Sequence, residues 1–261
     1  MNIRERIVWG MESTLKRVYK GKVKYVVDST GANRHLGRIY ARLLRLVQTP
    51  EMNTITVNDV DLSFENQGIV GAYAGEYPVI QDVLNEIQQE DVFWDIGAAF
   101  GLYSCSVATS ENVESVIAVE PTKRADTLKT NLSLNGFSAN VIQKAISDSP
   151  GCATISEKLQ LGKGDGVAVD VVTGDQLVQE GYPVPSIMKI DVEGAEYNVL
   201  NGMGKILSDS DLRVVYCEIH RNFLPDFGAS PEMVEDVFES HGFDLEIIED
   251  NGSGYNLKAT R

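Results

Sequence analysis

The first part of the chain suited to chemistry is a glycine-containing segment with a single acid. It runs from Phe93 to Gly101, with Asp95 near its start and Ala99 between Gly97 and Gly101. Two glycines allow a tight turn after a strand, and the small side chain of Ala99 lets a ligand approach the backbone. The carboxylate of Asp95 would repel a pyrophosphate, but it could hold a cation such as the amino group of an amino-acid-like ligand. The alternative is a turn that only lets a helix pack on a strand.

Two later segments could complete a nucleoside site. Glu120 lies 25 residues after Asp95 at the expected end of a strand, where a carboxylate can accept hydrogen bonds from both hydroxyls of a ribose. A small residue with polar neighbours follows at Ala145, Ser147 and Asp148, and this group could flank a base. An acid at a strand end is common by itself, but together with the first turn it indicates nucleoside binding.

The candidate catalytic residues follow two further strand ends. Asp191, Glu193 and Glu196 come directly after one strand, and Glu218 and His220 end another. Histidine can act as a general base near neutral pH, and Asp191 would end the central strand beside the glycine turn. Helix capping is the alternative role for Glu193 and Glu196. Carboxylates and imidazole can also ligate a divalent metal, but the spacing matches no defined metal motif, so we predict no metal site.

Two nucleotide-phosphate motifs are excluded by spacing. A nicotinamide-binding fingerprint needs G-x-G-x-x-G, but Ala99 and Leu102 stand where its second and third glycines belong. A P-loop also fails, because Gly164 follows the pair Gly162-Lys163 and Glu157 stands at the place of the first glycine.

Alternating strand and helix patterns position these residues. From about residue 76, a helical stripe after Pro78 is followed by short apolar runs that alternate with helical segments, and a closing antiparallel pair turns at Asn251-Gly252. This order predicts an open, mostly parallel sheet covered by helices on both faces, with ligands bound outside the carboxyl ends of the strands. The expected strands are 92–94, Ser115–Val119, Asn140–Ile146, Ala168–Thr173, Ser186–Ile190, Arg213–Ile219, Phe243–Ile248 and Tyr255–Ala259, and the expected helices include Lys123–Asn135, Glu193–Leu207 and Pro231–His241.

The N-terminal part differs from the rest. Residues 1–50 show helical stripes and hold 11 Lys and Arg against three acids, a charge of +8. Apolar residues then alternate around Asn58-Asp59, which predicts a β-hairpin. We therefore expect an extension over 1–70 and a catalytic domain over 71–261. The basic helices either pack with solvated charged faces or contact an anionic membrane surface or an acidic substrate.

Composition limits the class of protein. The net charge is −15, and the residues after position 50 carry −23, which argues against nucleic-acid affinity and suits a halophilic source. No apolar run approaches the roughly 18 to 20 residues of a membrane span, and the N-terminus lacks an export signal. The three scattered cysteines are typical of free thiols in a reducing compartment, so we expect a cytoplasmic protein.

Several segments resemble the FkbM family of S-adenosylmethionine-dependent methyltransferases. The resemblance covers roughly residues 70–250 in the right order, and KIDVEGAE and CEIH are its most specific parts; the first 65 residues lie outside it. It implies a Rossmann-like, seven-stranded sheet with an antiparallel last strand pair. The matching segments are FWDIGAAFGLYS (93–104), VIAVEP (116–121), KTNLSLNG (129–136), KAISDSPG (144–151), IMKIDVEGAEYNVLNGM (187–203) and VVYCEIHRN (214–222).

The resemblance also implies roles for single residues. The glycine turn with Asp95 and Ala99 would line the methionine part and the sulfonium of the cofactor, Glu120 would bind the ribose, and Ala145 to Asp148 would border the adenine. Asp191 would lie near the methyl group that is transferred. Two departures are present: Ala99 stands where family members often carry Asn, and Thr173-Gly174-Asp175 replaces a T-L-D-like segment.

These observations predict an enzyme that uses S-adenosylmethionine to methylate a hydroxyl or carboxyl oxygen of a sugar, glycan or related small acceptor. A hydroxyl needs a base, for which the candidates are Asp191 or His220 and then Glu193, whereas a carboxylate needs none. The basic N-terminus suggests an acidic or membrane-tethered acceptor, such as a lipid-linked saccharide. The alternatives are a non-catalytic cofactor-binding scaffold or regulator and an RNA methyltransferase; the acidic body and the absence of an N-P-P-Y-like motif argue against the latter.

Overall fold

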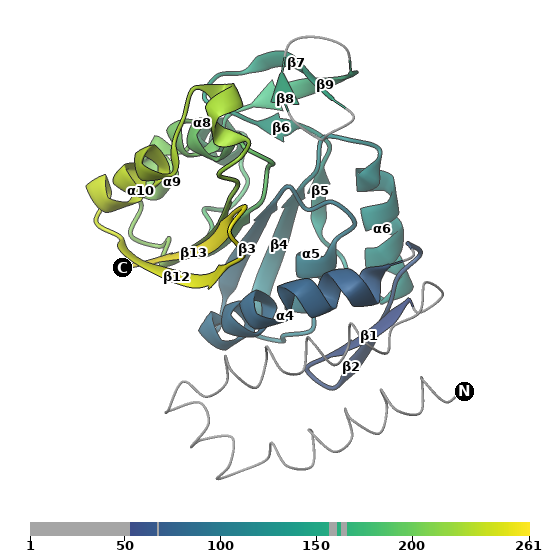
Figure 1. Cartoon of the computed structure of the whole chain (residues 1–261). Coiled ribbons are helices and arrows are strands. Elements are labelled where there is room, and N and C mark those ends of the chain that lie inside the picture. Colours follow the sequence, from purple (N-terminus) through teal and green to yellow (C-terminus); the bar gives the residue numbers. More distant parts are fainter. Residues whose placement is uncertain (1–52, 67, 157–160, 163–165) are drawn as a thin grey trace. The chain divides into compact units, whose positions relative to one another are not determined.

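The computed structural model describes residues 53–66, 68–156, 161–162 and 166–261 (Figure 1). The chain forms two compact units, Met1–Asp82 and Val83–Arg261. The helices predicted within residues 1–50 lie outside the described residues. Among the helices that the structure describes, none has both the length and the apolar character needed to cross a membrane.

The predicted β-hairpin is present in the first unit. Strand β1 (Thr54–Val57) pairs antiparallel with β2 (Val60–Ser63). Asn58 and Asp59 between them have φ angles of 49° and 65°. Two consecutive positive φ angles are typical of the type I′ turn, whose twist matches that of the two strands and which favours Asn and Asp.

Helix α4 (Ile69–Glu86) begins earlier than the sequence pattern predicts. The helical stripe was expected only after Pro78, but Pro78 lies inside the helix. A proline in a helix removes one backbone hydrogen bond, and this usually marks a helix boundary. Here the turn before the proline is anchored by apolar burial: Tyr73 is 2% exposed and Ala74 is fully buried. The hydroxyl of Tyr73 also donates to the carbonyl of Thr56, at 3.1 Å.

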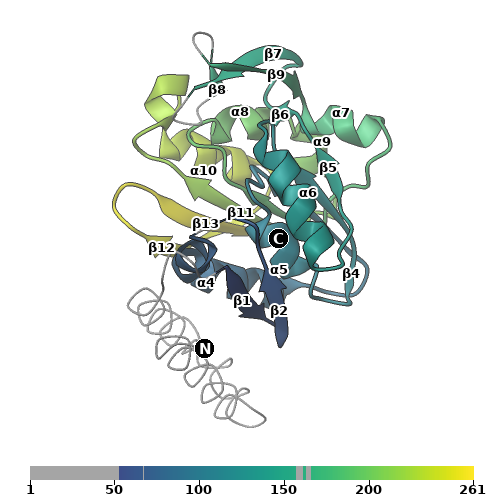
Figure 2. The ribbon, with the colours of Figure 1, turned by 90° about the vertical axis from the view of Figure 1, so that its right-hand side faces the viewer.

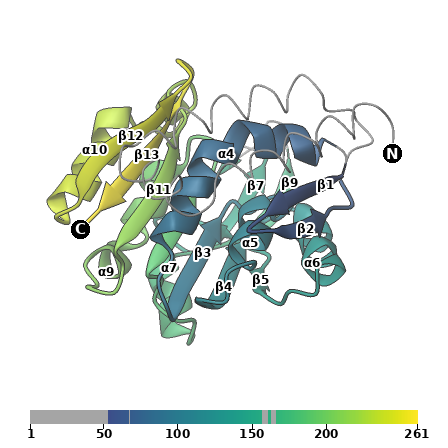
Figure 3. The same ribbon diagram turned by 90° about the horizontal axis from the view of Figure 1, so that it is seen from below.

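The second unit is built on a seven-stranded sheet, as predicted. Its order is β12-β13-β11-β10-β3-β4-β5, and Figure 3 shows the strands side by side from the β12–β13 pair to β5. Within this sheet, β13 alone runs in the direction opposite to the other six strands. The strands are β3 (Asp91–Ile96), β4 (Val113–Val119), β5 (Asn140–Ile142), β10 (Ile187–Ile190), β11 (Val214–Ile219), β12 (Asp244–Asp250) and β13 (Tyr255–Thr260).

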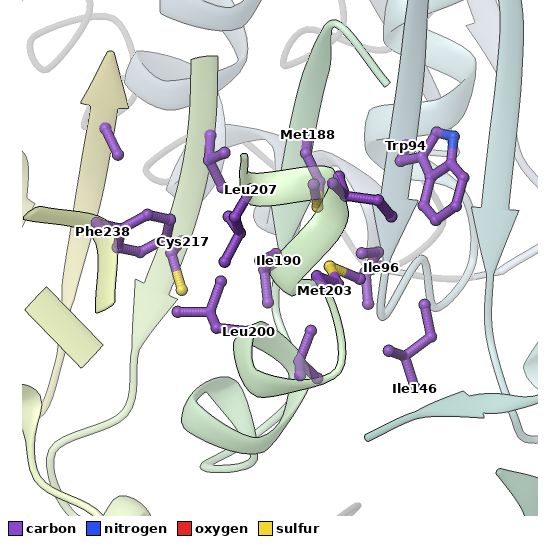
Figure 4. Close-up of a cluster of buried hydrophobic side chains, with 14 of the residues drawn as sticks. Trp94, Ile96, Ile146, Met188, Ile190, Leu200, Met203, Leu207, Cys217 and Phe238 are labelled. Atoms are coloured by element: carbon purple, nitrogen blue, oxygen red, sulfur yellow. The ribbon is translucent and has the colours of Figure 1, made fainter. Parts of the chain in front are cut away.

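The main core lies on one face of this sheet. Trp94, Ile96, Met188 and Ile190 of the two central strands pack there against apolar side chains of α8 (Glu196–Asn201), α9 (Gly204–Leu207) and α10 (Pro231–Ser240) (Figure 4). Side chains alternate along a strand, so Asp95 points to the opposite face. There it meets α5 (Leu102–Val107), which packs on β3 and β4. Helix α6 (Arg124–Leu134) follows β4 and agrees with its predicted range.

Two predicted strands lie partly or wholly in a second sheet. The expected strand Asn140–Ile146 is interrupted: β5 ends at Ile142, and β6 (Ala145–Ile146) pairs with β9 (Val167–Val172) instead. The expected strand Ala168–Thr173 corresponds to β9 and therefore does not belong to the main sheet. Strands β7 (Gly151–Ile155) and β8 (Leu161–Gly162) complete this four-stranded sheet, in the order β6-β9-β7-β8 (Figure 2).

The predicted helix Glu193–Leu207 is also divided. It begins only at Glu196 and is interrupted at Gly202, where the backbone packs so closely on the carbonyl of Ser147 that no side chain would fit. The second half, α9, begins with backbone N–H groups of Lys205 and Ile206 that donate to Asp175. Asp175 lies in α7 (Gly174–Gln179), a short helix that the sequence pattern did not predict. The unusual Thr173-Gly174-Asp175 segment thus caps one helix and supports another.

Candidate active site

A pocket of about 700 Å³, including space open to solvent, lies at the carboxyl ends of the central strands. Its walls come from the segments that follow β3, β4 and β10, and from the second sheet. Among the lining residues are Ile96, Gly97, Ala99, Val119, Glu120, Thr122, Arg124, Lys144, Ala145, Ile155, Leu161, Asp191 and Glu193.

The glycine turn after β3 forms one wall. Gly97 has a φ angle of +80°, and a Cβ atom there would collide with the carbonyl of Asp191, so only glycine fits. Ala99 also has a positive φ, 47°, a region in which Asn is common and Ala is rare. Its N–H donates to Oε2 of Glu120, at 3.0 Å. Gly101, with a φ of +85°, ends the turn and leads into α5.

Glu120 lies in the middle of the pocket wall and is held on both sides. Its side chain is only 5% exposed. Oε1 accepts hydrogen bonds from the N–H and the hydroxyl of Thr122, at 2.9 and 2.6 Å, while Oε2 accepts the bond from Ala99. A carboxylate has about four lone-pair positions, so this fixed group can still accept a ligand hydroxyl.

Asp95 lies beneath the turn rather than on the pocket wall. It is 2% exposed, and its Oδ2 accepts from the N–H and the hydroxyl of Ser104, at 2.9 and 2.6 Å. Burial raises its pKa to about 6, although the bonds from Ser104 and the charge of Lys189 act in the opposite direction. In this structure Asp95 therefore fixes the glycine turn to α5.

The predicted base-binding segment is placed only in part at the pocket. Ala145 lines it, but Ser147 is buried behind it and donates its N–H to the carbonyl of Val172, and Asp148 is exposed to solvent. The apolar wall is completed by Ile155 and Leu161 of the second sheet, which sequence reasoning missed. The alternating pattern of 151–155 was the available signal.

The structure brings the three predicted catalytic residues together. Nε2 of His220 lies 3.7 Å from Oδ1 of Asp191 and 3.6 Å from Oε2 of Glu193, and 3.8 Å from Oε1 of Glu218. One ligand atom from each of Asp191, Glu193 and His220 lies within 4.8 Å of the others. This spacing is too long for direct hydrogen bonds between the side chains, but it allows them to contact the same acceptor oxygen or cation. Asp191 and Glu193 line the pocket, whereas His220 lies next to these two acids and is not itself among the lining residues.

His220 is held in the cluster by a buried acid. Its Nδ1 lies 2.6 Å from Oε1 of Glu196, and its ring is stacked on that of Phe223. Burial alone would lower the pKa of His220. The hydrogen bond to Glu196 and the charges of the surrounding acids outweigh this effect and raise the pKa from 6.5 to about 9. Burial in turn raises the pKa of Glu193, an effect that the positive charge of His220 opposes.

Two residues of this cluster were not identified as functional from the sequence. Glu196 was considered only as a helix cap; its Oε1 does accept from the N–H of Gly194, at 2.9 Å, but it also binds His220. Lys189 is fully buried, with its Nζ 3.8 Å from both Asp191 and Glu218. The available signal was a lysine within an otherwise apolar central strand.

Known proteins resemble the larger unit of the chain. Residues 95–245 match the family model of the methyltransferase FkbM domain. The hexuronic acid methyltransferase AglP of Haloferax volcanii is 31% identical over 160 residues, which are 58% of this chain and 65% of that protein. The chain thus matches somewhat less than two thirds of the length of this relative.

Solved structures of similar shape have low sequence identity. A precorrin-6y C5,15-methyltransferase from Geobacter metallireducens is 13% identical, with a TM-score of 0.45, and the match covers 82% of this chain and 98% of that one. Trm5b from Pyrococcus abyssi is 15% identical, also with a TM-score of 0.45, over 82% of this chain and 56% of that one.

Proposed function

This chain belongs to the FkbM family of methyltransferases, and from that premise we propose that it transfers the methyl group of S-adenosylmethionine to an oxygen of a hexuronic acid in a glycan. The observation that carries the proposal is the cluster of Asp191, Glu193 and His220 at one end of a pocket that otherwise suits a nucleoside. The sugar class follows the relative from Haloferax volcanii, whose name describes a hexuronic acid methyltransferase.

The side chains that line the pocket fit this cofactor. Its apolar part, with Ile155 and Leu161, suits a flat base, and the buried carboxylate of Glu120 suits ribose hydroxyls. The backbone of the turn at Gly97 and Ala99 would border the methionine part. When bound there, S-adenosylmethionine supplies an electrophilic methyl group on a sulfonium.

The charges in the cluster suggest separate roles for its members. A histidine with a pKa of about 9 is protonated at neutral pH, so His220 would donate a hydrogen bond from Nε2 to an acceptor oxygen. Asp191 ends the central strand β10 and faces the pocket, and it would accept the proton of a sugar hydroxyl as the new bond from oxygen to carbon forms. Glu193, whose Oε2 lies 3.6 Å from Nε2, would help to hold the imidazolium.

The methylated atom decides whether the proton acceptor matters. A hydroxyl must lose a proton during transfer, whereas a carboxylate of a hexuronic acid is already ionised at neutral pH and needs no base. With a carboxylate acceptor, the positive charges of His220 and Lys189 would offset the repulsion between the acceptor and the surrounding acids.

The test uses the full chain, S-adenosylmethionine and oligosaccharides that contain glucuronic acid, with formation of S-adenosylhomocysteine measured by mass spectrometry. Asp191→Asn and the exposed control Asp211→Asn are compared with the wild type. A hydroxyl acceptor predicts an alkali-stable ether and a loss of about a hundredfold or more in kcat for Asp191→Asn alone. A carboxyl acceptor predicts an alkali-labile ester and little loss. Failure of the folded chain to bind S-adenosylmethionine would contradict the proposal.

A further inference from the structure

We propose that Glu196 is a positioning residue: its buried carboxylate holds the imidazole of His220 through Nδ1, so that a protonated Nε2 is directed toward Asp191 and Glu193, the two acids that line the pocket. The inference rests on the proposed function, since it assigns a role within the same site. It goes beyond that function because it assigns a role to Glu196, which was not among the predicted site residues. In this role, Glu196 sets the orientation and the protonation of His220.

The contacts of Glu196 define the orientation of the ring. Glu196 is fully buried in the first turn of α8, and its Oε1 lies 2.6 Å from Nδ1 of His220 at the end of β11. An ionised carboxylate only accepts hydrogen bonds, so Nδ1 must carry a proton. The other ring nitrogen, Nε2, is thereby directed to the opposite side, where Asp191 and Glu193 line the pocket.

The second oxygen of Glu196 indicates that His220 is charged. Among the residues that the structure describes, Oε2 of Glu196 is buried and has no hydrogen-bond partner. A buried carboxylate that is only partly hydrogen-bonded is costly unless a positive charge lies beside it. The positively charged form of His220, in direct contact with Oε1, provides that charge.

The groups around His220 favour the same state. Nε2 lies between 3.6 and 3.8 Å from three carboxylates, and Nδ1 contacts a fourth. Two cations offset part of this negative charge: Nζ of Lys189 lies 3.8 Å from both Asp191 and Glu218, and Arg124 acts on Glu193. Phe223 covers one side of the ring and contributes no charge. The charged groups that face the imidazole are Asp191 and Glu193 after β10, Glu196 of α8 and Glu218 of β11.

The substitution Glu196→Gln separates this role from helix capping. A glutamine oxygen can still accept the N–H of Gly194, so a residue that only capped the helix would be replaced without effect. Glutamine is also similar in size, but it carries no charge. The variant therefore removes the electrostatic part of the contact with His220 and retains the local structure of α8.

The experiment is a pH titration of the imidazole nitrogens by NMR, on full-length protein labelled with ¹⁵N-histidine. The chain has only three histidines, and His220→Gln assigns the signals. Glu239→Gln, an exposed acid on α10, is the matched control. We expect Glu196→Gln to lower the pKa of His220 by about one unit or more, a tenfold loss of proton affinity, and the control to leave it unchanged. An unchanged pKa of His220 in folded Glu196→Gln overturns the proposal.

Two further measurements make the result decisive. If Glu196→Gln does not fold, the wild-type spectrum still tests the proposal: a neutral His220 at pH 7, or an Nδ1 without a proton, overturns it. Methyl transfer and binding of S-adenosylmethionine are measured in parallel. A loss of kcat with unchanged cofactor affinity and a lowered pKa supports the positioning role. Absence of cofactor binding in the wild type would contradict the proposed function and leave the NMR result for Glu196 intact.

Discussion

The raised pKa of His220 makes the stability of the folded chain depend on pH in a defined direction. The ordinary histidine value is 6.5, and in the folded chain the bond to Glu196 and the neighbouring acids raise the pKa to about 9. The folded state therefore binds this proton more tightly than the unfolded state does. The resulting stabilisation is fully present below about pH 6.5 and is lost as the pH rises through about 9.

The magnitude follows from the size of the shift. A difference of about 2.5 units corresponds to about 3 kcal/mol in the free energy of unfolding, at 1.36 kcal/mol per unit. The side chain is only 15% exposed, so solvent screens little of this effect. We therefore expect the free energy of unfolding to fall by about 3 kcal/mol between pH 6 and 10.

The assay is urea denaturation of the wild type, His220→Gln and His241→Gln at a series of pH values from 6 to 9.5. We expect the wild type and the His241→Gln control, which changes a histidine at the end of α10, to lose stability in parallel as the pH rises. His220→Gln should be less stable at pH 6, because Glu196 loses its counter-charge, and should show a much flatter pH dependence. Equal slopes for His220→Gln and the wild type would refute the reasoning.

Three other changes test the pocket. Gly97→Ala should cost about 2 kcal/mol or more in the free energy of unfolding, because the added Cβ meets the carbonyl of Asp191. Gly136 has a similar φ and open space around it, so the control Gly136→Ala should cost only about 1 kcal/mol. Glu120→Gln should weaken S-adenosylmethionine binding about tenfold in calorimetry, since charged acceptors bind hydroxyls more strongly; unchanged affinity would remove Glu120 from the ribose site. EDTA at pH 7 should leave activity unchanged, because a protonated His220 cannot ligate a metal; a loss that added Mg²⁺ or Mn²⁺ restores would contradict this.

Local sequence patterns predicted the β-hairpin and the central strands of the main sheet. The hairpin around Asn58-Asp59 and the strands β3, β10 and β11 follow from turn residues and short apolar runs. Such patterns do not say which sheet a strand joins, because that depends on pairing over long sequence distances. The sequence pattern therefore predicted a strand at Ala168–Thr173 but not its pairing with β6 and β7 in the second sheet.

The sequence predicted those site residues that lie at strand ends, but not the contacts between side chains from different elements. Asp191, Glu193 and His220 were expected near one another because parallel strands end at the same edge of a sheet. The contact between Glu196 and His220 joins residues 24 positions apart on different elements, and no spacing rule predicts it. Asp95 shows a further limit: the strand end was predicted correctly, but the alternation of β3 directs its side chain towards α5.

The close packing of Gly97 on the carbonyl of Asp191 has a consequence for engineering. The two segments touch through their backbones, so the separation between the glycine turn and the backbone of Asp191 does not depend on any rotatable side chain. In a graft onto another scaffold, either segment alone would lose this spacing. The two would have to be transplanted as a pair, together with the adjacent parallel strands β3 and β10, whose register aligns Ile96 with Ile190.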